Sequence, residues 1–245
     1  MSADGPGVDA SDDESPGVYQ LLRGYIVNGD LQPNERLVES DLTRLTGGTR
    51  SVVRDALIRL EHDGLVTREP NRGARVRMVS ESEAIEITEA RAALEMLTVR
   101  HAAVRASDDD VRALHAVLGE MRDAVGQGDL LAYTELNGRF HQAILAAAQH
   151  RTAVGLLAML RSQGIRFQYR TILQPGRARR SLTEHEAIAE SIAAHDPDAA
   201  EAAMRVHMVG VVETLRAAIT RYGGRRVIRD HGSGTYRAPA SGGGG

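Results

Sequence analysis

The chain contains 245 residues, more than one small domain usually holds, and its length therefore predicts two domains. Aromatic residues make up only 3% of it and tryptophan is absent, so aliphatic side chains must build the cores, which favours helices over β-sandwiches. A net charge of −3 argues against indiscriminate coating of nucleic acid, and the absence of cysteine excludes disulfides and thiolate metal sites. With no signal peptide and no apolar run of bilayer length, the sequence predicts a cytoplasmic protein without a membrane segment.

The first part of the chain carries the pattern of a small DNA-binding domain. Apolar residues recur at helical spacing in three stretches, over residues 17–28, 39–45 and 50–62. In the second of them, Leu42 and Leu45 are expected to face inward. Two short strands follow, over residues 65–68 and 74–78, joined by a Pro-Asn-Arg-Gly turn. Three helices followed by such a hairpin predict a winged helix-turn-helix domain over residues 17–79.

The third predicted helix has a basic face and an apolar face. The hydroxyl of Thr49 can cap its N-terminus. Its first turn presents polar side chains on one face, those of Arg50, Ser51 and Arg54. The opposite face can pack inward, through Val53, Leu57 and Leu60. Between residues 50 and 77, seven arginines stand against four acidic residues, so the basic excess is local. These residues favour a DNA-contacting surface, with a small protein-binding module as the alternative.

Six short motifs occur in order along this stretch: Asp-Leu-Gln-Pro from residue 30, Leu-Val-Glu from 37, Thr-Arg-Ser-Val-Val-Arg-Asp-Ala-Leu from 49, Leu-Glu from 60, Asp-Gly-Leu-Val from 63 and Arg-Gly-Ala-Arg-Val from 72. Together they resemble the N-terminal domain of GntR-family transcription regulators. The resemblance implies base and phosphate contacts in the major groove, by Thr49, Arg50, Ser51 and Arg54. It also implies a wing tip near the minor groove at Arg72 and Gly73. The chain departs from the family at Asn34 and within residues 51–55, but neither departure removes an arginine.

No strand pattern appears after Met78, so residues 81–222 are expected to form an all-helical bundle. Six helices are predicted in it, over residues 84–105, 108–125, 130–149, 152–172, 181–195 and 198–222. The acidic residues 1–16 and the Gly-rich and Arg-rich residues 223–245 are expected to be disordered. The predicted fold is therefore mostly α, with a winged helix-turn-helix followed by a six-helix ligand-binding bundle.

A few polar residues stand out on these apolar helices. Asn137 and His141 are four residues apart and share one face of the third bundle helix. His185 lies near the start of the fifth, and His207 lies in the middle of the sixth. Imidazoles and a side-chain carbonyl from different helices can meet around one divalent cation, with positions left for water or ligand. The same spacing is more often that of exposed or hydrogen-bonded histidines, so the residues alone leave both interpretations open.

Five further motifs occur in this part of the chain: Glu-Ala-Arg-Ala-Ala-Leu-Glu from residue 89, Asn-Gly-Arg-Phe-His from 137, Glu-His-Glu-Ala-Ile from 184, Asp-Pro-Asp-Ala-Ala from 196 and Met-Arg-Val-His from 204. They resemble the FCD effector domain of the FadR subfamily, and six helices make the domain similar to the VanR-like branch. The resemblance implies a Zn, Ni or Mn ion, with a carboxylate effector completing the coordination. The implied ligands are Asn137, His141, His185 and His207.

Two residues of this implied site have particular chemistry. Asn137 stands where the family has Asp, and because it is a neutral donor, metal affinity is expected to depend on an anionic effector. Arg91 is the candidate for binding the carboxylate of the effector, and a salt bridge to Glu95 one helical turn away is the alternative.

These features predict a ligand-responsive transcription regulator, most often a repressor in such families, that binds a palindromic operator as a homodimer. A small organic acid in the bundle would change its DNA affinity. One alternative is a metal-dependent enzyme in which Glu184 or Glu186 acts as base, although no HExxH pair, nucleophile motif or phosphate loop is present. The other alternative is a metal-ion sensor. We expect a regulator and not an enzyme.

Overall fold

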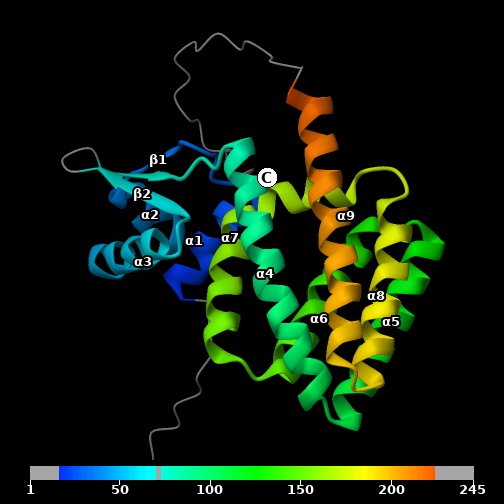
Figure 1. Ribbon diagram of the computed structural model, residues 1–245. Helices are drawn as coiled ribbons and strands as arrows, with labels where there is room; N and C mark the ends of the chain where they lie inside the picture. The colour runs from blue at the N-terminus through cyan, green and yellow to red at the C-terminus, as the bar shows by residue number, and fades with distance from the viewer. Residues whose placement is uncertain (1–16, 70–72, 224–245) are drawn as a thin grey trace, which may run out of the picture.

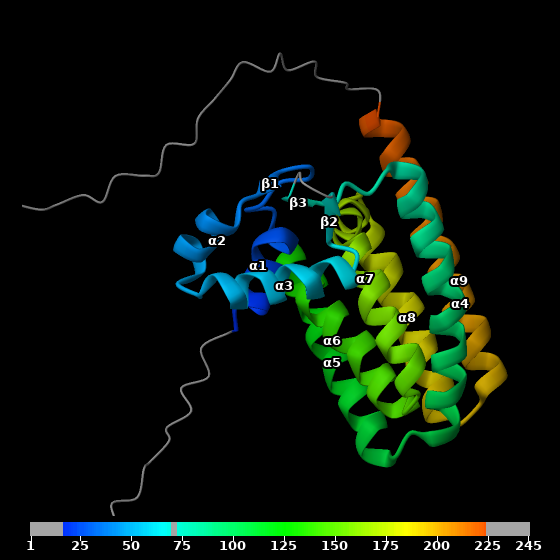
Figure 2. The ribbon, with the colours of Figure 1, turned by 90° about the vertical axis from the view of Figure 1, so that its left-hand side faces the viewer.

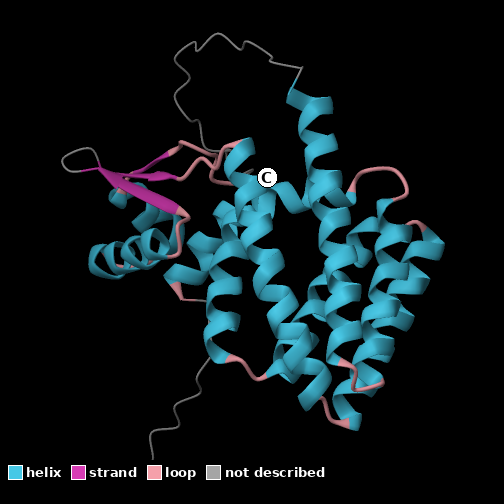
Figure 3. Ribbon diagram, viewed as in Figure 1, coloured by secondary structure: helices cyan, strands magenta, loops and turns pink. Residues whose placement is uncertain are grey.

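The computed structural model describes residues 17–69 and 73–223, which form a small mixed unit and a larger helical unit (Figures 1 and 3). The first unit consists of α1 (Val18–Asn28), β1 (Arg36–Leu37), α2 (Glu39–Thr46), α3 (Arg50–His62), β2 (Val66–Glu69) and β3 (Gly73–Val76). The second consists of α4 (Glu81–Arg105), α5 (Asp108–Gln127), α6 (Leu130–Ala148), α7 (Arg151–Ile172), α8 (Arg177–Ala193) and α9 (Pro197–Gly223). The predicted fold class, a winged helix-turn-helix followed by a six-helix bundle, is confirmed.

The first unit is built on the apolar face of α3. The three residues predicted to face inward are fully buried there, namely Val53, Leu57 and Leu60. They share a core with side chains from both other helices and from the hairpin, including Leu22, Ile26, Leu42, Val66 and Val76. The prediction was wrong for Leu45, which is exposed. Helix α2 has only about two turns, and it buries the side chain of Leu42 but not that of Leu45. Each such burial contributes about 1.5–3 kcal/mol, so α3 is held firmly from behind.

Local chemistry sets the start of α3. Gly47 adopts a φ of 70°, a left-handed conformation that glycine favours, and α2 ends there. Oγ1 of Thr49 then accepts a hydrogen bond from the backbone N–H of Val52 at 3.4 Å. Thr49 therefore caps α3 as predicted. The connection between α2 and α3 is short, and the first turn of α3 is exposed to solvent.

The sheet of this unit has three strands in the order β1-β3-β2, all antiparallel. The predicted hairpin is present as β2 and β3, with Val66 opposite Val76. Strand β1 was not predicted, because it contains only two residues and exists through pairing with β3, for example Leu37 with Ala74. The wing turn at residues 70–72 lies outside the described residues.

The second unit is a bundle with an aliphatic core, as its composition predicted. Its helices begin and end within a few residues of the predicted limits, and Ser107 and Asp110 form a capping box at the start of α5. Helix α8 begins at Arg177, four residues earlier than predicted. The side chain of Arg177 is buried and pairs with Glu184, further along the same face of the helix. None of the helices in the described residues is long and apolar enough to cross a membrane.

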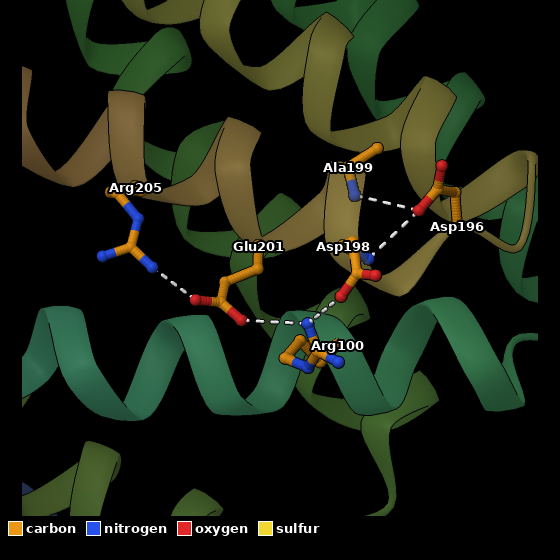
Figure 4. A network of polar contacts seen from close by, with 6 residues as sticks. All are labelled: Arg100, Asp196, Asp198, Ala199, Glu201 and Arg205. Carbon is orange, nitrogen blue, oxygen red and sulfur yellow. Dashed lines mark hydrogen bonds and ion pairs between the residues drawn. The ribbon is translucent and has the colours of Figure 1, made fainter.

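Helices α4 and α9 lie side by side along one flank of the bundle (Figures 1 and 2). Nη1 of Arg100 on α4 contacts Asp198 at 2.5 Å and Glu201 at 3.0 Å on α9 (Figure 4). Glu201 also pairs with Arg205, and Oδ1 of Asp196 caps α9 by accepting from two backbone N–H groups. These exposed ion pairs contribute about 0–1 kcal/mol each, so they orient the two helices more than they stabilise them.

The two units meet where α1 lies against α7 (Figure 1). Nη2 of Arg23 donates to Oγ of Ser162 at 2.7 Å. One residue further along α7, Nε2 of Gln163 donates to the carbonyl oxygen of Asp63 at 3.2 Å. Gly64 follows with a φ of 69°, and a Cβ at this position would lie 2.3 Å from Nε2 of Gln163. The left-handed backbone favours glycine at residue 64, and a side chain there would also displace the end of the Gln163 side chain.

Candidate DNA-binding surface and metal centre

The first turn of α3 carries the predicted DNA-contacting residues on its exposed side, namely Arg50, Ser51 and Arg54. Nε and Nη2 of Arg54 donate to the two carboxylate oxygens of Glu39, at 3.2 and 3.0 Å. The hydrogen bond from Arg54 lowers the pKa of Glu39, so this carboxylate is ionised at neutral pH. Helix α2 thus orients the Arg54 guanidinium while offsetting part of its charge.

Not every arginine counted in this region belongs to that surface. The guanidinium of Arg59 lies 4.1 Å from the ring centroid of Tyr19, where it packs α3 against α1. Arg77 pairs with Glu83 at the joint between the two units. Nη1 of Arg75 donates to a backbone carbonyl at 2.9 Å. The sequence count therefore overstates the basic surface, which is concentrated at the start of α3. Gly73 begins β3 with a φ of 82°, and Arg72 lies outside the described residues.

The three histidines predicted as metal ligands meet inside the bundle. His141 of α6, His185 of α8 and His207 of α9 are 6%, 0% and 3% exposed. Each offers one ring nitrogen, and these nitrogens all lie within 4.8 Å of one another. Their ring centroids are 5.3, 5.4 and 4.5 Å apart. The fold thus assembles a cluster of nitrogen donors, of the kind that suits Zn and Ni.

The buried carboxylate of Glu95 and the half-buried carboxylate of Glu184 lie beside two of these histidines. Nδ1 of His207 donates to Oε2 of Glu184 at 2.8 Å. Nδ1 of His141 lies 3.1 Å from Oε2 of Glu95. A histidine held through Nδ1 presents the lone pair of Nε2 to a metal ion, and carboxylates commonly orient metal-binding histidines in this way. The hydrogen bond therefore prepares the ring of His207 for coordination, and Glu95 lies close enough to orient the ring of His141.

Arginines hold both carboxylates in their ionised form. Oε1 of Glu95 accepts from Arg91 at 2.9 Å and from Arg161 at 3.3 Å. Burial by itself raises the pKa of Glu95, but the positive charges of Arg161 and Arg91 outweigh it and hold the pKa well below its usual value. Arg177 binds both oxygens of Glu184, each at 2.8 Å. Two ionised carboxylates therefore lie beside the histidine cluster, and arginines bind both of them.

His185 has no such support. Neither of its ring nitrogens has a hydrogen-bond partner among the described residues, and the ring packs 4.8 Å from that of Phe140. Burial lowers its pKa well below the usual value, and burial likewise lowers the pKa of His141 to about 4, so both rings are neutral at pH 7. An unsatisfied buried polar group costs about 1–3 kcal/mol. A metal ion at the cluster would give His185 a partner, which is the best evidence that the residues present fit one.

A cavity of about 350 Å³ opens beside the histidine cluster. Its lining includes His141, His207 and Asn137, so the fourth predicted ligand lies at the same cavity as two of the other three. Arg91 also lines the cavity while it pairs with Glu95. The salt bridge considered as the alternative role of Arg91 is therefore present, and it leaves the side chain at the cavity wall.

The acids considered as catalytic bases are both engaged elsewhere. Glu184 is bound by Arg177 and His207, and Glu186 pairs at 2.6 Å with Arg122 on the bundle surface. Neither is a free base beside the cavity. Sequence reasoning did not assign Arg177 to the site, although its spacing of seven residues from Glu184 places both on one helix face.

A winged helix-turn-helix joined to a six-helix bundle that contains a cavity is the architecture of a DNA-binding transcription regulator. Residues 15–76 match the family described as bacterial regulatory proteins, gntR family, and residues 86–210 match the FCD domain. The chain therefore belongs to the GntR family of bacterial transcription regulators and carries an FCD effector domain. It is a regulator and not an enzyme, as predicted.

Known proteins of this kind are similar over most of the chain. The HTH-type transcriptional repressor RspR of Escherichia coli K12 is 27% identical over 199 residues, which cover 81% of this chain and 87% of RspR. The repressor GlaR of the same strain is 27% identical over 209 residues, covering 82% and 95%. Among solved structures, E. coli McbR/YncC has a TM-score of 0.67 at 21% identity and covers 84% of this chain and 96% of its own. A GntR regulator from Rhodococcus sp. RHA1 has a TM-score of 0.62 at 22% identity, covering 82% and 96%. These two structures support the fold alone.

Proposed function

We propose that this regulator is a repressor that binds a palindromic operator as a homodimer, and that a small organic acid bound at a metal ion in the bundle changes its DNA affinity. The observation that carries the proposal is the buried histidine cluster, backed by arginine-held carboxylates and adjoining a cavity lined by Arg91. The names of RspR and GlaR, both repressors, support the sign of regulation.

In this proposal His141, His185 and His207 hold the ion, and the amide oxygen of Asn137 is a fourth, neutral donor. A divalent ion bound there supplies a Lewis acid that attracts a carboxylate. Glu184 holds the ring of His207 through Nδ1 and Glu95 lies against Nδ1 of His141, which leaves Nε2 of both rings to bind the ion. Since no carboxylate of the protein is proposed as a ligand, an anionic effector balances the charge of the ion.

The metal site predicts a defined stoichiometry. The full-length protein is expected to bind about one Zn²⁺ per chain, and His185→Ala is expected to abolish this binding, because a trio of protein ligands is the minimum for most such sites. Elemental analysis after dialysis against Zn²⁺ measures it. His150→Ala, in a histidine that packs 5.1 Å from His101, serves as the control and should bind normally. Equal metal content in His185→Ala and in the native protein would contradict the site.

The proposed dimer uses the outer side of α4 and α9. Large apolar residues are exposed on both helices, namely Leu97, Val104, Val206 and Val209. The two helices are adjacent (Figures 1 and 2), and Leu97 and Val104 lie within about one turn of Arg100, whose ion pairs join α4 to α9. One recognition helix reads too few base pairs for an operator, and a second copy with the same apolar face supplies the other.

A charge on this face should separate the copies. The double variant Val104→Glu with Val206→Glu is expected to sediment as a monomer and to bind operator DNA at least about tenfold more weakly, because a carboxylate buried at an interface is strongly unfavourable. Analytical ultracentrifugation at micromolar concentration measures the mass. Leu131→Glu, at an exposed position of α6, is the control. A double variant that still sediments as a dimer would rule out this face.

The regulator function is tested first by titrating the protein against its own upstream DNA, at several salt concentrations and with excess unrelated DNA. Binding should resist the competitor and weaken with salt, with a log–log slope of about −0.9 per phosphate contacted. The same affinity for unrelated DNA would mean that this region holds no operator, and the search would move to other promoters.

Metal-ion sensing is a second candidate, favoured by the completeness of the buried histidine cluster. The two candidates differ in what changes DNA affinity. If metal alone produces the full change, the ion is the signal, whereas an effect that requires an organic acid in addition supports the effector.

A further inference from the structure

The DNA-binding unit contributes one residue to the effector cavity of the bundle. Arg23 lies on α1, yet it lines the same cavity as Arg91 and His141. It reaches this position because α1 packs against α7, where its guanidinium donates to Oγ of the buried Ser162 (Figure 1). Part of the cavity lining thus comes from the first unit, which also contains α3, the helix expected to contact DNA.

Arginines dominate the charge of the cavity lining, and those of the bundle are paired. Arg91 and Arg161 share the carboxylate of Glu95, and Arg177 binds both oxygens of Glu184. Among the described residues, the bundle supplies three arginines to the cavity lining, and each of the three forms an ion pair with one of these carboxylates.

Arg23 differs from them in its partner. In the described part of the chain, its guanidinium donates a hydrogen bond to the neutral hydroxyl of Ser162. Glu135 also lines the cavity, but its side chain is exposed and no ion pair joins it to Arg23 there. A half-buried guanidinium opposite a hydroxyl gains most from an anion, because it can bind a carboxylate through two parallel hydrogen bonds.

We propose that Arg23 is part of the effector site and binds a second carboxylate of the effector. The inference rests on the proposed function, in which a first carboxylate binds at the metal ion. A ligand with one carboxylate satisfies only the ion, whereas a dicarboxylate spans the cavity to Arg23. The effector class is therefore a small dicarboxylic acid.

The same residue connects the cavity to the recognition helix. Tyr19, one turn before Arg23 on α1, donates from its hydroxyl to the carboxylate of Asp63 at the end of α3. The backbone carbonyl of Asp63 accepts from Gln163, the neighbour of Ser162 on α7. A ligand that draws Arg23 away from Ser162 changes the contact between α1 and α7. The end of α3 is hydrogen-bonded to both of these helices through Asp63. Binding at Arg23 is thereby coupled to the position of α3.

The test compares ligands matched in length, succinate with butyrate and glutarate with valerate. Their affinities for the full-length, Zn²⁺-loaded protein are measured by calorimetry in the native protein and in Arg23→Gln, Arg23→Lys and Arg112→Gln. Glutamine keeps a donor for Ser162 without the charge, lysine keeps the charge, and Arg112 lies on α5, where it pairs with Asp109 on the surface. Circular dichroism verifies that each variant is folded. Operator affinity is then measured with and without the tightest ligand.

We expect one of the dicarboxylates to bind the native protein about 10-fold to 100-fold more tightly than its monocarboxylate partner, as one charge-assisted pair predicts. Arg23→Gln should lose this margin, Arg23→Lys should retain part of it and Arg112→Gln all of it. The ligand should also shift operator affinity in the native protein but not in Arg23→Gln. Equal margins in the native protein and Arg23→Gln would overturn the role of Arg23 and leave the proposed acid effector standing. If none of these acids binds the native protein, both the proposed effector class and the inference fail.

Discussion

Replacing Arg50 with alanine is expected to weaken operator binding by about 30-fold to 10⁴-fold, because each lost arginine contact to DNA costs about 1–3 kcal/mol and a dimer loses two. The guanidinium of Arg50 is exposed on the first turn of α3 and makes no ion pair within the described residues, so it is free to bind a base edge or phosphate. Fluorescence anisotropy with an operator fragment measures the change.

The comparison variant for Arg50 is Arg112→Ala, which removes an exposed arginine on α5 and should leave binding unchanged.

Arg54→Ala is also expected to abolish tight binding, and it additionally leaves the carboxylate of Glu39 without its partner near the DNA. The double variant with Glu39→Gln should therefore recover part of the loss. Full binding by both single arginine variants, with unchanged circular dichroism, would disprove this surface.

Replacing Glu95 with glutamine is expected to lower the free energy of unfolding by about 3–5 kcal/mol, because it leaves buried positive charges without their anion. Arg91 and Arg161 both pair with this carboxylate, and His141 lies against it. In a domain of this size the melting temperature should fall by at least about 6 °C. Chemical and thermal unfolding of the metal-free protein measure the effect without any contribution from a bound ion.

The matched control for Glu95 is Glu120→Gln, which breaks an exposed pair with Arg139 and should change the stability by less than about 1 kcal/mol. Adding Arg91→Met to Glu95→Gln should recover part of the loss, because one of the uncompensated charges is removed. A Glu95→Gln protein as stable as the native one would show that this network does not depend on its anion.

The local features of the fold could be predicted from the sequence because they arise from interactions between residues close in the chain. Apolar spacing located the helices, and Thr49 and Ser107 cap helices as hydroxyl residues do. Errors appeared where local pattern and tertiary packing differ. Leu45 fits the apolar period of α2 but has no core to face, and β1 exists through its pairing with β3.

The candidate site was predicted only in part, for the same reason. Spacing placed Asn137 and His141 on one face of a helix, and resemblance to a known domain joined them to His185 and His207. Neither could establish that Glu184 holds His207, because that contact depends on how α8 packs against α9.

What the sequence by itself determined is the order of the elements, the basic first turn of α3 and the residue types of the histidine cluster, since these follow from composition, spacing and motifs. The tertiary structure decided which side chains meet. Glu95 contacts three side chains from three helices, His185 is buried with no hydrogen-bond partner in the described part of the chain, and Arg23 of the first unit lines the cavity of the second. Apart from the pair of Arg91 with Glu95, these contacts join residues far apart in the chain, and only the packing of complete helices brings them together.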